Sequence, residues 1–192
     1  MSPSIQKLYD NVVAYAVNAI REHGGLDHTI SFHTRTGKVV AIACLVPEEP
    51  DEQYHMIQMM RLVGIVNEAT AVVVATEVYF AKHRDGEEVP NVRDHPDAQR
   101  GLATLLLWRE RGEIKQRSHL WRLDSTDEGT VELKQVEEFS ADAEADGWLT
   151  ELLCPRTPSG NQRRKAQAIV DAAIESGCLG GNPQRPAQVT VH

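Results

Sequence analysis

Apolar positions recur with helical spacing near the N-terminus. Pro3 suits the first turn of a helix, and Gly24 with Gly25 suits its end. The apolar residues between them that share one helix face are Ile5, Leu8, Tyr9, Val12, Val13, Ala16, Ala19 and Ile20. The pattern predicts an amphipathic helix over residues 4–22 that packs its apolar face on a core.

Two short strand patterns follow this helix. "TISFH" and "KVVAIACLV" are joined by "TRTGK", in which Gly37 can take a positive φ, so a β-hairpin is expected there. Asp51 then offers an N-cap to a second helix over residues 52–68, whose apolar positions 56, 59, 60, 63 and 66 form a stripe.

The most regular strand pattern is "ATAVVVATEVYFAKH" at residues 69–83. Alternation places Val72, Val74 and Phe80 on one face, and Glu77 with Tyr79 on the other. We expect the valine face to pack on the helices and the Glu77 face to be partly solvated, as antiparallel sheets allow.

A polar segment of 17 residues at 84–100 precedes the next hairpin pattern, formed by "GLATLLLWRE" and "IKQRSHLWRL". Loops of that length inside a domain are usually functional or mobile. "TVELKQVEE" adds a further strand pattern. The order α-β-β-α-β-β-β-β predicts an α+β fold, with a mostly antiparallel sheet of five to six strands and the helices packed on one face.

The C-terminal third is expected to be helical. "SADAEADGWLTELL" suits a short helix capped by Ser140, with Leu152 and Leu153 on its buried side, and residues 161–177 suit a second helix that ends at Gly177.

These patterns predict one domain over residues 1–178. Its core is expected at 1–138 and its helical part at 139–178, with a loose tail at 179–192.

Composition supports a globular protein without a membrane segment. Of the 192 residues, 41% are apolar and 25% charged, and the longest apolar stretch, "VVAIACLV", is far shorter than a bilayer span. The N-terminus lacks the features of a secretory signal, so a cytoplasmic location is expected. Cys44, Cys154 and Cys178 are expected to be reduced because none has zinc-site spacing. We expect no cofactor and no metal.

Charge is distributed unevenly along the chain. The net charge is −8, which argues against general nucleic-acid binding, and residues 124–151 hold ten acidic side chains against Lys134 alone, a local net charge of −9. Cations gather directly after this segment, at Arg156, Arg163, Arg164 and Lys165. Three consecutive cations at a helix start oppose the helix dipole. The cluster is therefore a candidate interface or anion-binding site, compensated by acidic residues of the same or a partner subunit, or by a bound phosphate or nucleic acid.

Glu77 is the main candidate for chemistry, and three interpretations stay open. It lies on the solvated face of its strand, or it pairs with His119, Arg117 or Lys115 in an ion pair or interface, or it acts as a general base. His95, in "DHPD", could contribute to a weak loop metal site, although that sequence is more typical of a turn. The candidate polar site is thus Glu77, Tyr79, His95 and His119.

Part of the chain resembles a group of small α+β proteins of bacteria and phages that has no established activity. The resemblance covers residues 29–125, and its matching positions are Thr76, Glu77, Tyr79, His95, Pro96 and Asp97. In such relatives a strand tends to begin directly after "PD", whereas here residues 98–101 intervene. The resemblance implies the same fold and places Glu77 and His95 near one site.

Binding is the leading functional hypothesis. We expect a non-catalytic binding or assembly protein of bacterial or phage type that acts through protein–protein contacts and self-associates, as a dimer, with a host or bacterial protein as a further partner. One alternative is a small hydrolase or transferase that uses Glu77 with His95 or His119. The other is a phage-encoded acidic inhibitor of a host protein that presents "SADAEADG".

Overall fold

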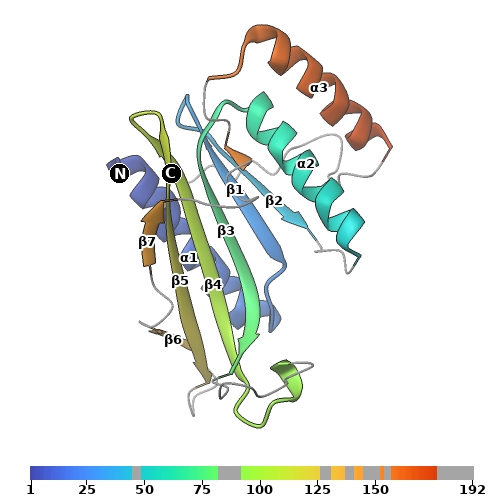
Figure 1. Cartoon of the computed structure of the whole chain (residues 1–192). Helices are drawn as coiled ribbons and strands as arrows, with labels where there is room; N and C mark the ends of the chain where they lie inside the picture. The colour runs from blue at the N-terminus through green and yellow to red at the C-terminus, as the bar shows by residue number, and fades with distance from the viewer. Residues whose placement is uncertain are drawn as a thin grey trace.

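An antiparallel sheet with the strand order β2-β1-β3-β4-β5-β6 forms the centre of the molecule (Figure 1), and β7 pairs with β5. The structure is a computed structural model of the chain, and it describes residues 1–44, 49–81, 92–125, 131–136, 141–144, 152–153 and 157–176. The predicted α+β class is confirmed, and so is the order of the elements up to β6.

The helices and strands alternate along the chain as follows. The helical elements are α1 (Pro3–His23), α2 (Pro50–Val66), the short 3-10 helix η1 (Val92–Asp94) and α3 (Gly160–Glu175). The strands are β1 (His28–Thr34), β2 (Val39–Cys44), β3 (Ala69–Phe80), β4 (Gln99–Glu110), β5 (Glu113–Ser125), β6 (Val131–Gln135) and β7 (Ala141–Glu144).

Residues with positive φ close both predicted hairpins. Gly37, with φ 81°, lies in the β1–β2 turn, and Arg111 and Gly112, with φ 52° and 90°, form the two-residue connection between β4 and β5. In the β4–β5 turn, positive φ at both central residues suits the right-handed twist of paired strands, so this turn helps to fix the register of the pair.

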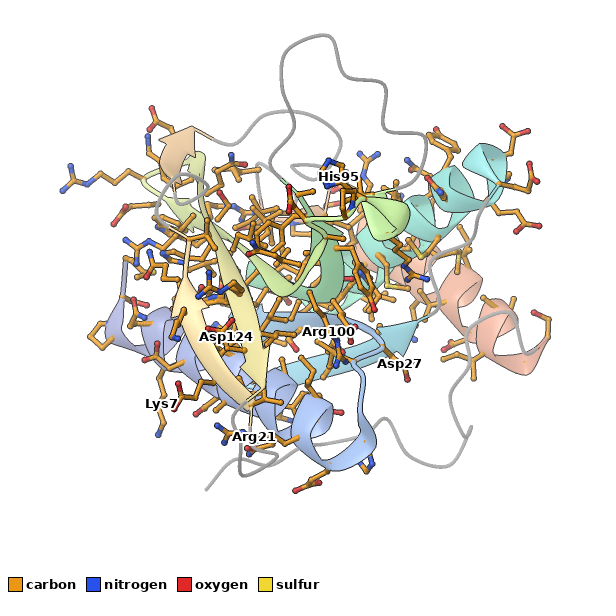
Figure 2. All side chains as sticks on the ribbon, turned by 90° about the horizontal axis from the view of Figure 1, so that it is seen from below. Lys7, Arg21, Asp27, His95, Arg100 and Asp124 are labelled. Atoms are coloured by element: carbon orange, nitrogen blue, oxygen red, sulfur yellow. The ribbon has the colours of Figure 1, made fainter. Side chains whose placement is uncertain are left out.

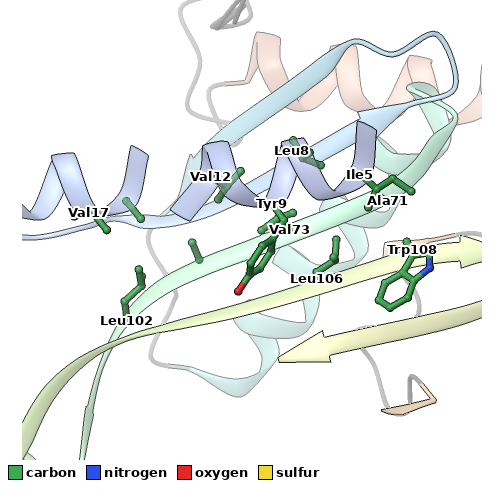
Figure 3. Packing of buried hydrophobic residues seen from close by; sticks show 12 residues of the cluster. Ile5, Leu8, Tyr9, Val12, Val17, Ala71, Val73, Leu102, Leu106 and Trp108 are labelled. Atoms are coloured by element: carbon green, nitrogen blue, oxygen red, sulfur yellow. The ribbon is translucent and has the colours of Figure 1, made fainter. Parts of the chain in front are cut away.

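The helices cover both faces of the sheet, which corrects the expectation that they share one face. α1 packs on Ala71, Val73 and Ala75 of β3 (Figure 3), whereas α2 and α3 share a cluster with Val72 and Val74 on the other face. The cause lies in β3, where two alanines that are 0% exposed leave room for α1 directly over the strand. The two faces of β3 are therefore both apolar over residues 71–75, and the face that carries Glu77 is solvated only near the strand's end.

The start of α2 also differs from the expectation. The helix begins at Pro50 after the N-cap Glu49, so Asp51 lies in the first turn, where its charge favours the helix dipole rather than capping the end. Met60, on the inner face of this helix, is buried in the core.

The C-terminal third contains a strand where a helix was expected. Ala141–Glu144 pairs with Lys115–Ser118 of β5, which β6 leaves unpaired, and its sequence alternates alanine with acidic residues as a strand does. Leu152 and Leu153 are buried, as predicted. Ser140, Cys154, Arg156, Cys178 and the tail at 179–192 lie outside the described residues.

The last helix is close to its predicted position. α3 begins after Ser159, whose side chain accepts from the backbone N–H of Gln162 in a capping box, and it packs against α2. Among the helices of the described segments, none is long and apolar enough to cross a membrane.

Candidate functional site

Glu77 forms a bidentate ion pair with Arg100. Arg100 Nε lies 2.6 Å from Glu77 Oε1, and Arg100 Nη2 lies 2.9 Å from Glu77 Oε2. The Glu77 side chain is 17% exposed. Of the three interpretations open from the sequence, the structure therefore supports an ion pair, with Arg100 in place of the cations of β5.

The register of β3 and β4 brings these two residues together. Glu77 lies opposite Leu102, and Tyr79 lies opposite Arg100, so Glu77 and Arg100 are diagonal neighbours on one face. Arg100 was missed because the strand was expected to start at Gly101, whereas β4 begins at Gln99. Arg100, Leu102 and Thr104 alternate along the chain, and this pattern could have placed Arg100 on the same strand face as Leu102 and Thr104.

The ion pair also fixes the loop that follows α1. Arg100 Nη2 donates to the carbonyl of Gly24, and the backbone N–H of Leu26 donates to Glu77 Oε2 over 3.3 Å. Gly24 ends α1 in the left-handed conformation, with φ 75°. The side chains of β3 and β4 thus hold the α1–β1 loop in place.

Hydrogen bonding from Arg100 lowers the pKa of Glu77, and the same bond raises the pKa of Arg100. Leu26 adds a further donor to the carboxylate. A carboxylate with a lowered pKa and three donors is a weak proton acceptor, and this environment does not suit a general base.

Beside this ion pair lies a hollow of about 530 Å³, here called the tyrosine hollow. Residues from α1, the α1–β1 loop, β1, β3 and η1 line it, among them Tyr15, His23, Asp27, Glu77, Tyr79 and Arg93. Segments distant in sequence therefore meet at one end of the sheet.

The two tyrosines of the hollow are open to solvent. Tyr15 is 54% exposed and Tyr79 39% exposed, and the Arg93 guanidinium carbon lies 4.7 Å from the centre of the Tyr79 ring. Such a distance is typical of a cation–π contact. The arrangement offers two aromatic rings and an arginine to an incoming molecule.

His119 belongs to a different cluster, which is partly buried and includes Tyr9 of α1. The Tyr9 hydroxyl hydrogen-bonds with Thr104 Oγ1 over 2.8 Å and with His119 Nδ1 over 2.6 Å, and His119 also contacts the Trp121 ring. Burial raises the pKa of Tyr9. His119 therefore shares the face of Glu77 but has Tyr9 as its hydrogen-bond partner.

His95 lies in the turn after η1. Its Nδ1 accepts from the backbone N–H of Asp97 over 3.0 Å, which fits the turn role expected from "HPD". Figure 2 shows His95 well apart from Arg100 and Asp27, on the opposite side of the sheet from α1. His95 does not line the tyrosine hollow.

The cationic start of α3 is balanced within the chain at Arg163. The Arg163 guanidinium donates a hydrogen bond to Glu68, which also accepts one from Arg35 Nε over 2.6 Å. Both arginines lower the pKa of Glu68, and the hydrogen bond from Arg35 has the larger effect. Arg164 and Lys165 are exposed. Arg163 therefore needs no partner subunit to neutralise it, and Arg156 lies in a part of the chain that is not described.

The acidic segment is also partly balanced from within. Asp124 lies 2.7 Å from Arg122 Nε and 2.8 Å from Lys134 Nζ, and hydrogen bonds from these two cations lower the pKa of Asp124 to about 2. Across the described ranges, no three His, Cys, Asp or Glu side chains are grouped so that they could hold a metal ion.

Comparisons with family models, with curated proteins and with solved structures give no match to this chain. The resemblance to small bacterial and phage proteins consequently stays a prediction, and the function rests on the geometry of the site.

Replacing Glu77 with glutamine is expected to destabilise the protein at pH 7 by roughly 1–2 kcal/mol, because Arg100 loses its charged partner in a half-buried position. The folded-state pKa of Glu77 is lowered, so its contribution is present above the unfolded-state pKa and is lost as the pH falls through the folded-state value. Urea unfolding of both proteins between pH 7 and pH 3 should show the difference shrinking toward acid.

The control for this prediction is Glu132→Gln, which removes the same charge from an exposed position on β6. We expect that variant to stay within about 0.5 kcal/mol of wild type. A Glu77→Gln protein as stable as wild type at pH 7 would contradict the structural role of the ion pair.

Proposed function

We propose that this protein is a non-catalytic binding protein that acts through protein–protein contacts, with the tyrosine hollow as its contact site. One observation carries the proposal. Two exposed tyrosines and an arginine surround a hollow whose wall is held by the Glu77–Arg100 ion pair.

The residue types favour a protein partner. Tyrosine and arginine are enriched among the residues that dominate binding energy, because they combine a large contact area with hydrogen-bonding groups. The large hydrophobic side chains exposed on the described residues are Tyr15, Tyr54, Tyr79, Val92 and Ile169. Tyr15 and Tyr79 line the hollow, and Val92 precedes Arg93 in η1.

The ion pair supports binding by preorganising the site. Glu77 and Arg100 hold Gly24 and Leu26 in place through their backbone groups. A loop that is already ordered loses less conformational entropy when a partner binds, so more of the contact energy appears as affinity.

The contacts of Glu77 and His119 argue against the catalytic alternative. It requires a carboxylate within hydrogen-bond reach of a second polar group that can exchange protons. Glu77 is bonded to an arginine and a backbone N–H, and His119 is bonded to Tyr9. These contacts favour structural roles for both residues.

A peptide selection tests the proposal. Random twelve-residue peptides displayed on phage are selected on the immobilised protein, and the affinity of a selected peptide is measured by fluorescence polarisation. Tyr79→Ser and Tyr15→Ser are each expected to weaken binding about tenfold or more, as loss of a central aromatic contact does.

Tyr54→Ser is the matched control. Tyr54 is 60% exposed on α2 and does not line the hollow, so its loss should leave the affinity unchanged. Thermal unfolding checks that all three variants are folded. Selected peptides that bind the Tyr15→Ser/Tyr79→Ser double variant as tightly as wild type would refute the proposal.

A further inference from the structure

β2 is the outermost strand on its side of the sheet. Within the described residues it pairs with β1 only, through partners that run from His28 with Cys44 to His33 with Val39. A strand in this position presents one row of backbone N–H and C=O groups away from the sheet. The row is available for a further strand.

The register identifies which residues point outward. The Thr34 N–H donates to the Lys38 carbonyl over 2.8 Å, so Lys38 belongs to a hydrogen-bonded pair. In an antiparallel ladder such pairs alternate with pairs whose backbone groups point the other way. Val40 and Ile42 therefore bond β1, and the backbone groups of Val39, Ala41 and Ala43 point to the open edge.

Among the residues that the structure describes, this edge carries none of the usual protection against pairing. Natural edge strands are blunted by lysine, proline or a bulge, yet β2 reads "VVAIAC" and its six pairings with β1 are continuous. Val40 and Ile42 are only partly buried. An uncharged strand of apolar residues is compatible with a second copy of itself, because no like charges meet.

We propose that a second copy of this chain binds along β2, antiparallel to it, so that two sheets join into one across a two-fold axis. The two helical layers then continue as well, because a two-fold axis perpendicular to the sheet keeps each α2 on the same face as its partner. No residue that lines the tyrosine hollow lies on β2, so this inference stands apart from the proposed function.

One register uses all three outward residues. Val39 then pairs with Ala43 of the partner copy, Ala41 lies opposite its own counterpart, and about six backbone hydrogen bonds form. Val40 lies opposite Ile42 of the other copy, which makes a cross-strand contact between β-branched side chains.

The charges at the two ends of β2 fit this direction. Exposed Lys38 precedes the strand, whereas the exposed acidic residues Glu49, Asp51 and Glu52 lie at the start of α2, which follows it. An antiparallel pair places the basic end of one copy toward the acidic end of the other, and a parallel pair would place like charges together.

Ala41→Pro tests the edge directly. Proline removes one outward N–H and leaves the hydrogen bonds to β1 intact, which is the situation in which edge strands accept proline. By sedimentation equilibrium, wild type should be a dimer and Ala41→Pro a monomer, with a dissociation constant raised at least about tenfold. A wild-type chain that is monomeric at all concentrations, or a folded Ala41→Pro dimer as tight as wild type, would overturn the proposal.

A cross-link tests the register and does not depend on how Ala41→Pro folds. In a chain whose three cysteines are replaced by serine, Ala41→Cys should oxidise to a covalent dimer, since opposed residues in a hydrogen-bonded pair lie at a separation that a disulfide spans. Thr36→Cys, in the β1–β2 turn, controls for chance collisions. Equal rates of cross-linking at positions 36 and 41 would count against the two-fold pair.

Discussion

The Phe32→Ala variant is expected to lose about 3–5 kcal/mol of unfolding free energy, as removal of a fully buried phenylalanine does. Phe32, on β1, is 0% exposed. It belongs to the same apolar cluster as Met60 and Val63 of α2 and Leu153, which follows β7 in the chain. Its removal leaves a cavity where β1, α2 and the chain after β7 meet. Urea unfolding monitored by circular dichroism measures the loss.

Tyr54→Ala provides the comparison. Tyr54 lies on α2 and is 60% exposed, so its truncation should change the free energy of unfolding by no more than about 0.5 kcal/mol. If Phe32→Ala unfolded at nearly the wild-type urea concentration, the packing of α2 on this face of the sheet would be wrong.

The second large effect is expected at Gly64, in the last turn of α2. A Cβ at this position would lie 2.6 Å from the carbonyl oxygen of Leu152 and 3.4 Å from Phe32 Cε1. A backbone oxygen cannot turn away as a side chain does, so Gly64→Ala must push the Leu152 segment off the helix. We expect a loss of about 1–3 kcal/mol from overpacking, although alanine alone would favour the helix by roughly 1 kcal/mol.

Gly160→Ala is the same substitution in an open place. In the described part of the structure, a Cβ at Gly160, at the start of α3, would meet no atom within 4 Å beyond its own chain neighbours and helix backbone. Helix propensity should therefore make that variant equal to wild type or slightly more stable. Opposite signs for the two variants, measured by thermal unfolding, would confirm the close contact between Gly64 and Leu152. A stabilised Gly64→Ala protein would exclude it.

The fold could be predicted largely from local patterns. The helical spacing over residues 4–22, Gly37 in the first turn and the alternation in "ATAVVVATEVYF" are local signals, and the helix, the turn and the strand that they predict are all present in the structure. The distribution of the helices could not be read in this way. It depends on Ala71 and Ala75, whose small size admits α1 only once the neighbouring strands are in register.

Only some residues of the site could be predicted from the sequence. Glu77 and Tyr79 stand out in their strand, and both line the hollow. Arg100 and Arg93 join them through the β3–β4 register and through η1, and that information is contained in no single segment. Residues 141–144 form a strand rather than a helix because the part of β5 that β6 does not cover is free to pair with them, and this too is not a local signal.

Glu77 has a structural role in this protein, through its ion pair with Arg100. The Glu77–Arg100 ion pair holds the loop after α1. Beside this loop, Tyr15 of α1, Tyr79 of β3 and Arg93 of η1 surround one hollow. The pairing of two copies along β2 would place two such hollows in one assembly, and a partner with two contact segments would then bind with increased avidity.

Hydrogen exchange of the protein with and without a selected peptide shows whether the tyrosine hollow is the contact site, because it reports where on the chain a partner binds. If a partner binds in the tyrosine hollow, exchange should be slower in the loop at residues 24–27 and in η1 at the rim of the hollow. Protection confined to α2 and α3, around Tyr54 and Ile169, with unchanged exchange at the hollow, would contradict it.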